Sequence, residues 1–312
     1  MRSLIQYFRS EKPDIVHTHS GKAGVLGRLA ARRAGVPIIV HTIHGPSFGP
    51  FQGPLANRGF TAAERFAGRV TTHFVAVSQA MIDQYLAAGI GRPEQYSRVF
   101  SGFALAPFLA SRNDPALRQR LGLAPDDLVA GKVARLFELK GHDDLLDVAP
   151  DLVAANPRLK FLFVGDGAWR ERLREKARGL GLEKRVVFAG LVPPEQIPNY
   201  LGIMDLVVHL SRREGLPRAL SQALAAARPV VAYDCDGARE ICLNQRTGFL
   251  VRPGDLEGLK QRLLQLASDA ALRERYGRAG QEFVRSEFSV EKMVETLYQL
   301  YLKLDGDGGE IV

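Results

Sequence analysis

Residues able to bind a phosphate or a sugar oxygen gather at positions 211–222, which read Ser-Arg-Arg-Glu-Gly-Leu-Pro-Arg-Ala-Leu-Ser-Gln. Pro217 suits the first turn of a helix, where its missing N–H costs nothing. The free backbone amides of such a turn bind phosphate or sugar oxygens, and Glu214 lies in the loop just before them. Gln222 shares a helix face with Arg218. The alternative is a loop and a buried helix with Glu214 on the surface.

A second group of charges lies in the segment 131–142, Gly-Lys-Val-Ala-Arg-Leu-Phe-Glu-Leu-Lys-Gly-His. Arg135 ends a predicted strand, and Lys140 with Gly141 opens the helix that follows. Two cations placed there form a clamp for a diphosphate, and they would stabilise the negative charge of a departing leaving group. The alternative is an arginine at a strand end and a solvated lysine.

Histidines follow two neighbouring strands, in His17-Thr-His19 and in His41-Thr-Ile-His-Gly45. At the carboxyl ends of parallel strands they favour hydrogen bonds to a sugar or a phosphate. Zinc binding is the competing interpretation, but no third ligand follows at a useful spacing, so we expect no metal. A core histidine with satisfied hydrogen bonds remains the alternative for His17 or His19.

Three other patterns carry less information. Gly165-Asp-Gly167 is typical of a tight turn from a strand to a helix. Asp234-Cys-Asp236 follows a late strand and indicates a pair of loop carboxylates. The two cysteines, Cys235 and Cys242, lack a metal-site or disulfide spacing and are expected to be structural thiols in a reducing compartment. A Ser/His/Asp nucleophile arrangement is not discernible.

These residues need a scaffold of parallel strands, and the hydrophobic pattern supplies two sets of them. Short β-branched runs alternate with helical patterns, which predicts an α/β fold with helices on the faces of parallel sheets. The first set of strands is expected at 14–17, 37–42, 74–77 and 98–100. The second is expected at 129–133, 160–164, 186–189, 206–210, 229–233 and 248–251.

Helices are predicted between these strands and at the end of the chain. In the first part they are expected at 22–34 and 79–88, the latter with Ser78 as N-cap and Gly89 after its end. In the second part they are expected near 143–155, 168–180, 195–203, 217–227 and 238–243, with three more over 255–304. The proline-containing stretch 104–126 is the expected linker, and 305–309 is an expected disordered tail.

The length of the chain and its charge restrict the number of domains and the classes of partner. A chain of 312 residues favours two domains. Residues 1–110 carry 12 Lys and Arg against 5 Asp and Glu, which indicates either an anionic acceptor or membrane surface as partner, or a solvated helix face. The basic residues concerned are Lys22, Arg28, Arg32, Arg33, Arg58, Arg65 and Arg69. Nucleic acid is disfavoured because no binding module accompanies them. No apolar run is long enough to span a membrane, so we expect a cytoplasmic protein, peripheral on the inner face of the membrane.

Taken together, these segments resemble the family 4 retaining glycosyltransferases of the GT-B fold, also called glycosyl transferases group 1. The motifs that carry the resemblance are Pro13-Asp-Ile-Val-His-Thr-His19, His41-Thr-Ile-His-Gly45, Val75-Ala-Val-Ser78, Arg135-x4-Lys140-Gly-His142, Val164-Gly-Asp-Gly167, Glu214-Gly-Leu-Pro217 and Pro229-Val-Val-Ala232. The resemblance extends from Pro13 to the last helix. It implies two Rossmann-like domains, the N-terminal one incomplete because the family's opening strand and glycine-rich loop have no counterpart.

The resemblance also implies a division of the chain. Residues 1–107 would form a partial acceptor-side domain and 108–288 the nucleotide-sugar-binding domain. The segment 289–312 would supply a helix, 290–304, that crosses back to the first domain, followed by a tail. Upstream strand–helix units missing from the chain would explain the four-strand first sheet.

The family's functional residues map onto matching positions. Arg135 and Lys140 would bind the donor diphosphate, Glu214 the hydroxyls of the donor sugar, and His44 the transferred sugar. The backbone of Gly215, Leu216 and Pro217 would line the same pocket, and Gln222 would bind the ribose. The expected reaction transfers a hexosyl group from a UDP- or GDP-sugar to a glycan or lipid-linked acceptor with retention, in lipopolysaccharide or exopolysaccharide synthesis. It needs no metal ion or other cofactor.

Two departures from the family pattern bear on activity. The family has glutamate where Gln222 stands, and a carboxamide accepts with one oxygen only, which weakens donor binding by about 1–2 kcal/mol. The usual Asn-Gly-x-Asp reads Ser101-Gly-Phe-Ala104. An alternative function is therefore a nucleotide-sugar-binding fragment or pseudoenzyme that needs a partner chain. A GT-B sugar-nucleotide epimerase is a third hypothesis, disfavoured by Glu214 together with Arg135 and Lys140.

Overall fold

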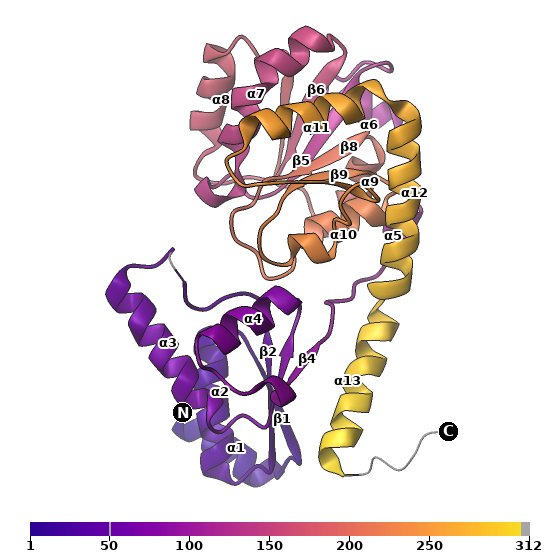
Figure 1. The fold of residues 1–312 in the computed structure, drawn as a ribbon. Coiled ribbons are helices and arrows are strands. Elements are labelled where there is room, and N and C mark those ends of the chain that lie inside the picture. Colours follow the sequence, from indigo (N-terminus) through magenta and orange to yellow (C-terminus); the bar gives the residue numbers. More distant parts are fainter. Residues whose placement is uncertain (50, 307–312) are drawn as a thin grey trace. The chain divides into compact units, whose positions relative to one another are not determined.

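The computed structural model describes residues 1–49 and 51–306, and most of the tail expected at 305–309 lies outside this range. The chain divides into two compact units, each built on its own parallel sheet (Figure 1). The first unit comprises Met1–Gly102, Glu214–Leu216 and Val290–Val312. The second comprises Phe103–Arg213 and Pro217–Ser289.

The first unit contains a four-stranded parallel sheet in the order β1-β2-β3-β4. Its strands are β1 (Ile15–His19), β2 (Ile38–Ile43), β3 (His73–Ala76) and β4 (Tyr96–Arg98). Its helices are α1 (Arg2–Glu11), α2 (Gly21–Ala34), α3 (Pro54–Gly68), α4 (Gln79–Ala87) and α13 (Val290–Asp305), with a short 3₁₀ turn at Pro93–Gln95. Each strand begins and ends within two residues of its predicted range.

The last helix, α13, packs on one face of this sheet, as Figure 1 shows. Leu300 is buried in a cluster with Ile38 and Val40 of β2, Val75 of β3 and Val99, the residue after β4. Alternate residues of a strand point to the same face, so this face is apolar where α13 covers it. Polar residues replace the apolar ones toward the carboxyl ends of β1 and β2.

Two expectations for this unit were wrong. No helix was predicted between the second and third strands, where α3 lies, because the glycine- and proline-containing stretch before it obscures the helical pattern. Arg28 does not belong to an exposed basic patch: its side chain is fully buried and forms an ion pair with Glu64 at 2.5 Å. A buried charge needs such a partner, because leaving it unpaired costs several kcal/mol, of order 3–5.

The second unit contains a six-stranded parallel sheet in the order β10-β9-β8-β5-β6-β7. Its strands are β5 (Leu128–Val133), β6 (Leu159–Val164), β7 (Val186–Gly190), β8 (Leu206–His209), β9 (Val230–Tyr233) and β10 (Gly248–Val251). The chain builds outward from β5 in one direction, then returns to β8 on the other side of β5. The strand order therefore reverses between β5 and β8, and ligands of such sheets bind at the carboxyl ends of the strands at this point.

The helices of the second unit follow the predicted alternation. They are α5 (Ala106–Leu109), α6 (Pro115–Arg120), α7 (His142–Ala155), α8 (Arg170–Gly179), α9 (Ile197–Gly202), α10 (Arg218–Ala225), α11 (Leu256–Ser268) and α12 (Ala270–Glu287). Short 3₁₀ segments lie at Glu138–Lys140, Pro194–Gln196 and Asp236–Glu240. The three helices expected at the end of the chain are confirmed as α11, α12 and α13.

The stretch 104–126, expected as the linker, contains regular structure. It holds α5 and α6, and the Asp114 carboxylate caps α6 by accepting from the amides of Ala116 at 2.9 Å and Leu117 at 3.2 Å. Pro115 occupies the first helical position, where proline is well tolerated. Arg118 then anchors the segment through a hydrogen bond to the carbonyl of Ile203 at 3.1 Å.

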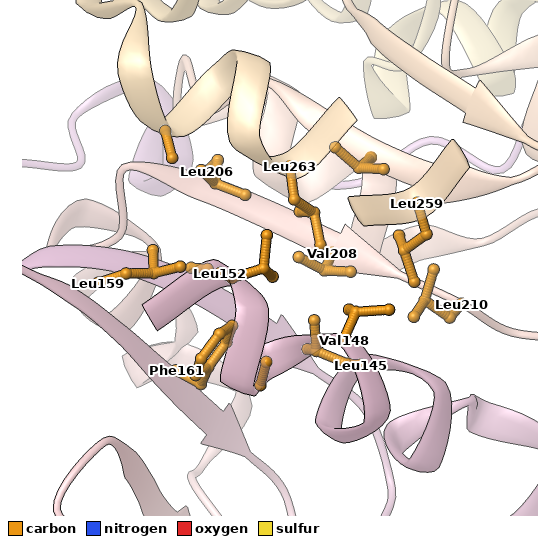
Figure 2. Close-up of a cluster of buried hydrophobic side chains, with 14 of the residues drawn as sticks. Leu145, Val148, Leu152, Leu159, Phe161, Leu206, Val208, Leu210, Leu259 and Leu263 are labelled. Atoms are coloured by element: carbon orange, nitrogen blue, oxygen red, sulfur yellow. The ribbon is translucent and has the colours of Figure 1, made fainter. Parts of the chain in front are cut away.

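The core of the second unit lies between the sheet and its helices (Figure 2). Leu145, Val148 and Leu152 lie three and four residues apart on α7 and so share one face. In Figure 2 they lie beside Val208 of β8 and Leu263 of α11. This packing fixes the carboxyl ends of β5 and β8 and the start of α7.

Candidate functional site

The loops after β5 and β8 meet at the point where the strand order reverses. The backbone amide of Arg212 donates to the carbonyl of Leu139 at 2.9 Å. The Lys140 ammonium donates to Ser211 Oγ at 3.2 Å. Two segments 71 residues apart in sequence are thus held together, and Lys140 lies beside the loop that leads into α10.

Gly141 makes this close approach sterically feasible. It has φ +65°, the left-handed region that favours glycine. A Cβ at this position would lie 2.3 Å from the carbonyl oxygen of Leu210. Any larger residue would therefore push the start of α7 away from the end of β8, and Lys140 with it.

The acidic residues at the start of α7 are engaged by other cations. Asp143 accepts from Arg172 at 2.8 Å and from Lys176 at 3.0 Å, and Asp144 pairs with Arg212 at 2.8 Å. Although partial burial acts to raise it, the hydrogen bonds from Arg172 and Lys176 lower the pKa of Asp143. The charge of Asp143 at neutral pH is therefore offset locally by those partners.

His142 follows the glycine and is neutral. Its side chain is fully buried and packs edge-on against Phe163, with ring centroids 5.2 Å apart. Burial, together with the charges of Lys132 and Lys140, lowers its pKa to about 2. The sequence analysis assigned His142 no role. Its position directly after Gly141, at the first residue of α7, could have indicated a buried histidine.

Arg135 lies in the same β5–α7 loop, two residues beyond the end of β5. Its side chain is exposed and its guanidinium carbon lies 5.7 Å from the centre of the Phe137 ring. The predicted convergence of Arg135 with Lys140 on one diphosphate stays a prediction. The contact that the structure gives is between Lys140 and the β8–α10 loop.

Helix α10 begins at Arg218 with Pro217 as its N-cap, as the sequence indicated. Its first amides point out of the helix at the carboxyl end of β8, which makes its start a place for an oxyanion. Gln222 lies one turn further along and is half-buried. Its role in ribose binding stays a prediction.

The residues Glu214, Gly215 and Leu216 belong to the first unit by their contacts. Ser78 Oγ donates to the carbonyl of Gly215 at 2.8 Å. A Cβ on Gly215 would lie 1.9 Å from the carbonyl oxygen of His44, so only glycine fits at this contact. Ser78 does precede α4 as predicted, but its hydroxyl binds Gly215 and forms no cap on that helix.

Four histidines near the carboxyl ends of β1 and β2 play different parts. His41 is buried at 1% exposure and its Nδ1 lies 2.9 Å from Thr18 Oγ1, so this residue is the core histidine. His19 Nδ1 lies 3.0 Å from His44 Nε2, and both side chains are exposed. His17 is engaged at both ring nitrogens, by Tyr301 and by Thr42, which fits the alternative of a satisfied histidine.

Burial lowers the pKa of His17 to about 4, and the neighbouring His19 and His44 act in the same direction. Burial also lowers the pKa of His19, and it lowers that of His41 well below its usual range. These three histidines are therefore neutral at pH 7. Within 1–49 and 51–306, no three side chains of His, Cys, Asp or Glu are arranged to hold a metal ion.

The turn Gly165-Asp-Gly167 contributes more to the site than its weak sequence signal suggested. The Leu136 amide donates to the Asp166 carbonyl at 3.0 Å, and the Gly165 amide donates to the Gly190 carbonyl at 2.9 Å. The β6–α8 turn thus supports the loop that carries Arg135. By contrast, Asp234 is paired with Arg239 at 2.9 Å, and Cys235 and Cys242 are thiols, as expected.

Comparison with known proteins identifies the class to which this scaffold belongs. The model of the family described as glycosyl transferases group 1 matches residues 113–283, and that of the glycosyl transferase 4-like domain matches residues 1–99. The chain belongs to the glycosyl transferases group 1 and is a glycosyltransferase. The family resemblance inferred from the sequence motifs is thereby confirmed.

Two curated relatives show the range of this class. The chain is 30% identical to the UDP-Gal:alpha-D-GlcNAc-diphosphoundecaprenol alpha-1,3-galactosyltransferase of Escherichia coli, over 97% of this chain and 80% of the relative. It is 31% identical to a GDP-mannose-dependent alpha-mannosyltransferase of Mycobacterium tuberculosis, over 81% of this chain and 64% of the relative. The names of both relatives specify a nucleotide sugar as donor, UDP-Gal in one and GDP-mannose in the other.

Solved structures agree on the fold. Anabaena HepE in complex with UDP superposes with a TM-score of 0.85 at 26% identity, covering 97% of this chain and 81% of that one. HepE in complex with UDP-glucose gives 0.82 at 27% identity, covering 95% and 81%. The predicted α/β class with two Rossmann-like parallel sheets, the GT-B fold, is confirmed. Among the described residues, no helix combines the length and apolar character required to cross a bilayer.

Proposed function

We propose that this glycosyltransferase transfers a hexosyl group from a UDP- or GDP-sugar to a glycan or lipid-linked acceptor, with retention of anomeric configuration. The pathway we propose is the synthesis of a cell-surface polysaccharide or lipopolysaccharide. The observation that carries the proposal is the contact of Lys140 with Ser211 at the reversal point of the second sheet. It puts a cation beside the loop that leads into α10, whose first turn would offer a diphosphate its backbone amides.

The donor diphosphate is proposed to lie between Lys140 and the first turn of α10, with Arg135 as a second cation. Ammonium, guanidinium and helix amides together replace a metal ion as the electrophilic partner of the leaving phosphate. Because Lys140 is held by its contact with the β8–α10 loop and the amides belong to a helix, these groups would stabilise the growing negative charge with little reorganisation during the reaction. We therefore propose a reaction without metal or other cofactor.

The other roles follow the family pattern at matching positions. Glu214 accepts hydrogen bonds from hydroxyls of the donor sugar, and the backbone of Gly215 to Pro217 lines the sugar pocket. Gln222 binds the ribose, and His44 contacts the transferred sugar. The close approach of Gly215 to the backbone of His44 supports the assignment of Glu214 and His44 to one sugar, since it joins their two loops within the first unit.

The proposed step is a front-face substitution at the anomeric carbon. The bond from this carbon to the β-phosphate oxygen breaks, and the acceptor hydroxyl oxygen forms the new bond on the same face of the sugar. The acceptor proton passes to an oxygen of the departing phosphate. Lys140 and Arg135 hold the charge that develops there, and configuration is retained.

The relatives support the choice of donor and acceptor classes. One relative is named for UDP-Gal and a diphosphoundecaprenol-linked acceptor, and another for GDP-mannose. The basic side chains of the first unit are suited to an anionic acceptor or membrane surface at the cytoplasmic face. Lys22 and Arg65 belong to this group, whereas Arg28 does not.

A transfer assay tests the proposal. The protein is incubated with UDP- and GDP-hexoses and with short-chain polyprenyl-diphosphate sugars as acceptors, and the product's anomeric configuration is read by NMR. Transfer with retention supports the proposal. Donor binding without transfer or hydrolysis, over all donors, would instead support the alternative of a nucleotide-sugar-binding protein that needs a partner chain.

A further inference from the structure

Two histidines of the first unit are joined by a hydrogen bond at the carboxyl edge of its sheet. His19 is the last residue of β1, and His44 follows the end of β2. His19 Nδ1 and His44 Nε2 are 3.0 Å apart, and the two ring planes are inclined by 27° with their centroids 5.2 Å apart. The contact fixes both the plane of the His44 ring and the atom that faces His19.

When both imidazoles are neutral, the hydrogen bond also couples their tautomers. Each neutral ring has one N–H and one unprotonated nitrogen, so one of the two rings must donate and the other accept. If His19 Nδ1 carries the proton, His44 accepts at Nε2 and its own proton is on Nδ1. If His44 Nε2 carries the proton, its Nδ1 is unprotonated. The protonation of Nδ1 of His44 is therefore linked to the tautomer of His19.

The ring of His17 packs against the ring of His19. The rings of His17 and His19 are stacked, with centroids 4.5 Å apart and an interplanar angle of 23°. Both nitrogens of His17 are held, Nδ1 by the Tyr301 hydroxyl on α13 and Nε2 by Thr42 Oγ1 at 2.6 Å. His17 is thus a fixed surface against which the exposed His19 ring rests.

We propose that His19 is a positioning residue for the transfer reaction, because its hydrogen bond holds His44 in one ring orientation and links the tautomer of His44 to its own. This inference rests on the proposed function, in which His44 contacts the transferred sugar. The His17 ring fixes His19, and His19 fixes His44. His19 itself makes no contact with the donor in this account.

The kinetic test compares two substitutions of His19. The Asn side chain places an amide near the position of Nδ1 and can keep the bond to His44, whereas His19→Leu removes it at similar size. We expect His19→Leu to lower kcat about tenfold, a typical loss when a contacting group is no longer oriented, with donor KM changed less than about twofold. His19→Asn should recover most of kcat. The matched control is His73→Asn. His73 lies on β3, and its Nε2 is 2.9 Å from Ser97 Oγ on β4; this substitution should leave kcat unchanged.

A second readout needs no activity. In ¹⁵N-labelled protein at pH 7.5, the ring nitrogen shifts of His44 should report a different tautomer population in His19→Leu than in the wild type, with His19→Asn again resembling the wild type. An unchanged His44 tautomer in His19→Leu, or equal kcat in His19→Leu and wild type, would overturn the inference. If the wild type transfers no hexose, the proposed function fails, while the ¹⁵N shifts still decide whether His19 sets the state of His44.

Discussion

Lys140 Nζ donates a hydrogen bond to Ser211 Oγ at 3.2 Å, and this contact joins the loops after β5 and β8. The two strands are neighbours in the sheet although β6 and β7 lie between them in the sequence. The contact therefore occurs where the strand order reverses, the position at which sheets of this type bind ligands. A cation fixed at this point, in contact with the loop that leads into α10, is the structural basis of the proposed donor site.

Glu214→Ala should separate sugar recognition from diphosphate binding. If Glu214 binds only hydroxyls of the donor sugar, turnover should fall by about 10²–10³, the usual cost of losing a preorganised polar contact in the transition state. The affinity for free UDP or GDP should stay within about twofold, since neither carries the sugar. Steady-state transfer rates and calorimetry give the two values. Glu282→Ala, at an exposed glutamate of α12, serves as control, and equal losses in both measurements would refute the assignment.

Gln222→Glu should strengthen donor binding. A carboxylate accepts hydrogen bonds from both ribose hydroxyls, whereas the present carboxamide accepts with one oxygen. The gain should be about 1–2 kcal/mol, or roughly 5- to 30-fold in Kd, measured by calorimetry with UDP and GDP. Gln119→Glu adds the same charge at an exposed position of α6 and should have no effect. No gain in Gln222→Glu would remove the ribose role.

Gly141→Ala should damage both stability and activity. A Cβ there meets the Leu210 carbonyl oxygen at 2.3 Å, in addition to the strain of φ +65°. Gly122 has nearly the same φ, +69°, but a Cβ there would meet no atom within 4 Å, so Gly122→Ala isolates the backbone strain. We expect a loss of about 1 kcal/mol for Gly122→Ala and of at least about 2–3 kcal/mol for Gly141→Ala, from denaturant unfolding. Equal losses would show that the β5–α7 and β8–α10 loops are not packed together.

The stability of the first unit should depend on the charge of His17. Its pKa is about 4 in the folded protein and 6.5 in the unfolded chain, so the unfolded chain binds more protons between these values. The contribution is fully present above pH 6.5 and is lost as the pH falls from 6.5 to 4. We expect it to amount to about 2 kcal/mol after allowance for partial exposure. Thermal unfolding at pH 7, 5.5 and 4.5 should show a smaller acid-side loss in His17→Asn than in the wild type, and parallel curves would contradict the expectation.

Much of the fold could be predicted because strand and helix periods agree with the local residue types. All six strands of the second unit lie within a residue of their expected ranges, and Pro217 correctly indicated the start of α10. The errors came where one signal has two meanings. Pro115 is compatible with a linker, but after Asp114 it begins a capped helix. Arg28 resembles its basic neighbours in sequence, whereas its partner, Glu64, is 36 residues away.

The sequence predicted the segments of the candidate site better than it predicted the contacts between them. The segments that contain Lys140 and Ser211 both stand out in the sequence, but their hydrogen bond depends on the order of strands, which the sequence pattern alone does not specify. The pairing of His19 with His44 has the same origin, since it requires β1 and β2 to be neighbours in this register. The departure of Ser78 from a capping role depends likewise on Gly215, 137 residues later.

The most direct test of the donor site is the affinity of Lys140→Ala for nucleotides, measured by calorimetry against the wild type and against Lys184→Ala, an exposed lysine outside the site. Each protein is titrated with UDP and UMP, and with GDP and GMP. We predict that the wild type and Lys184→Ala prefer the diphosphate, and that Lys140→Ala loses about 1.5–3 kcal/mol of diphosphate binding, with little change for the monophosphate. Diphosphate affinity equal to that of the wild type in Lys140→Ala would contradict the account.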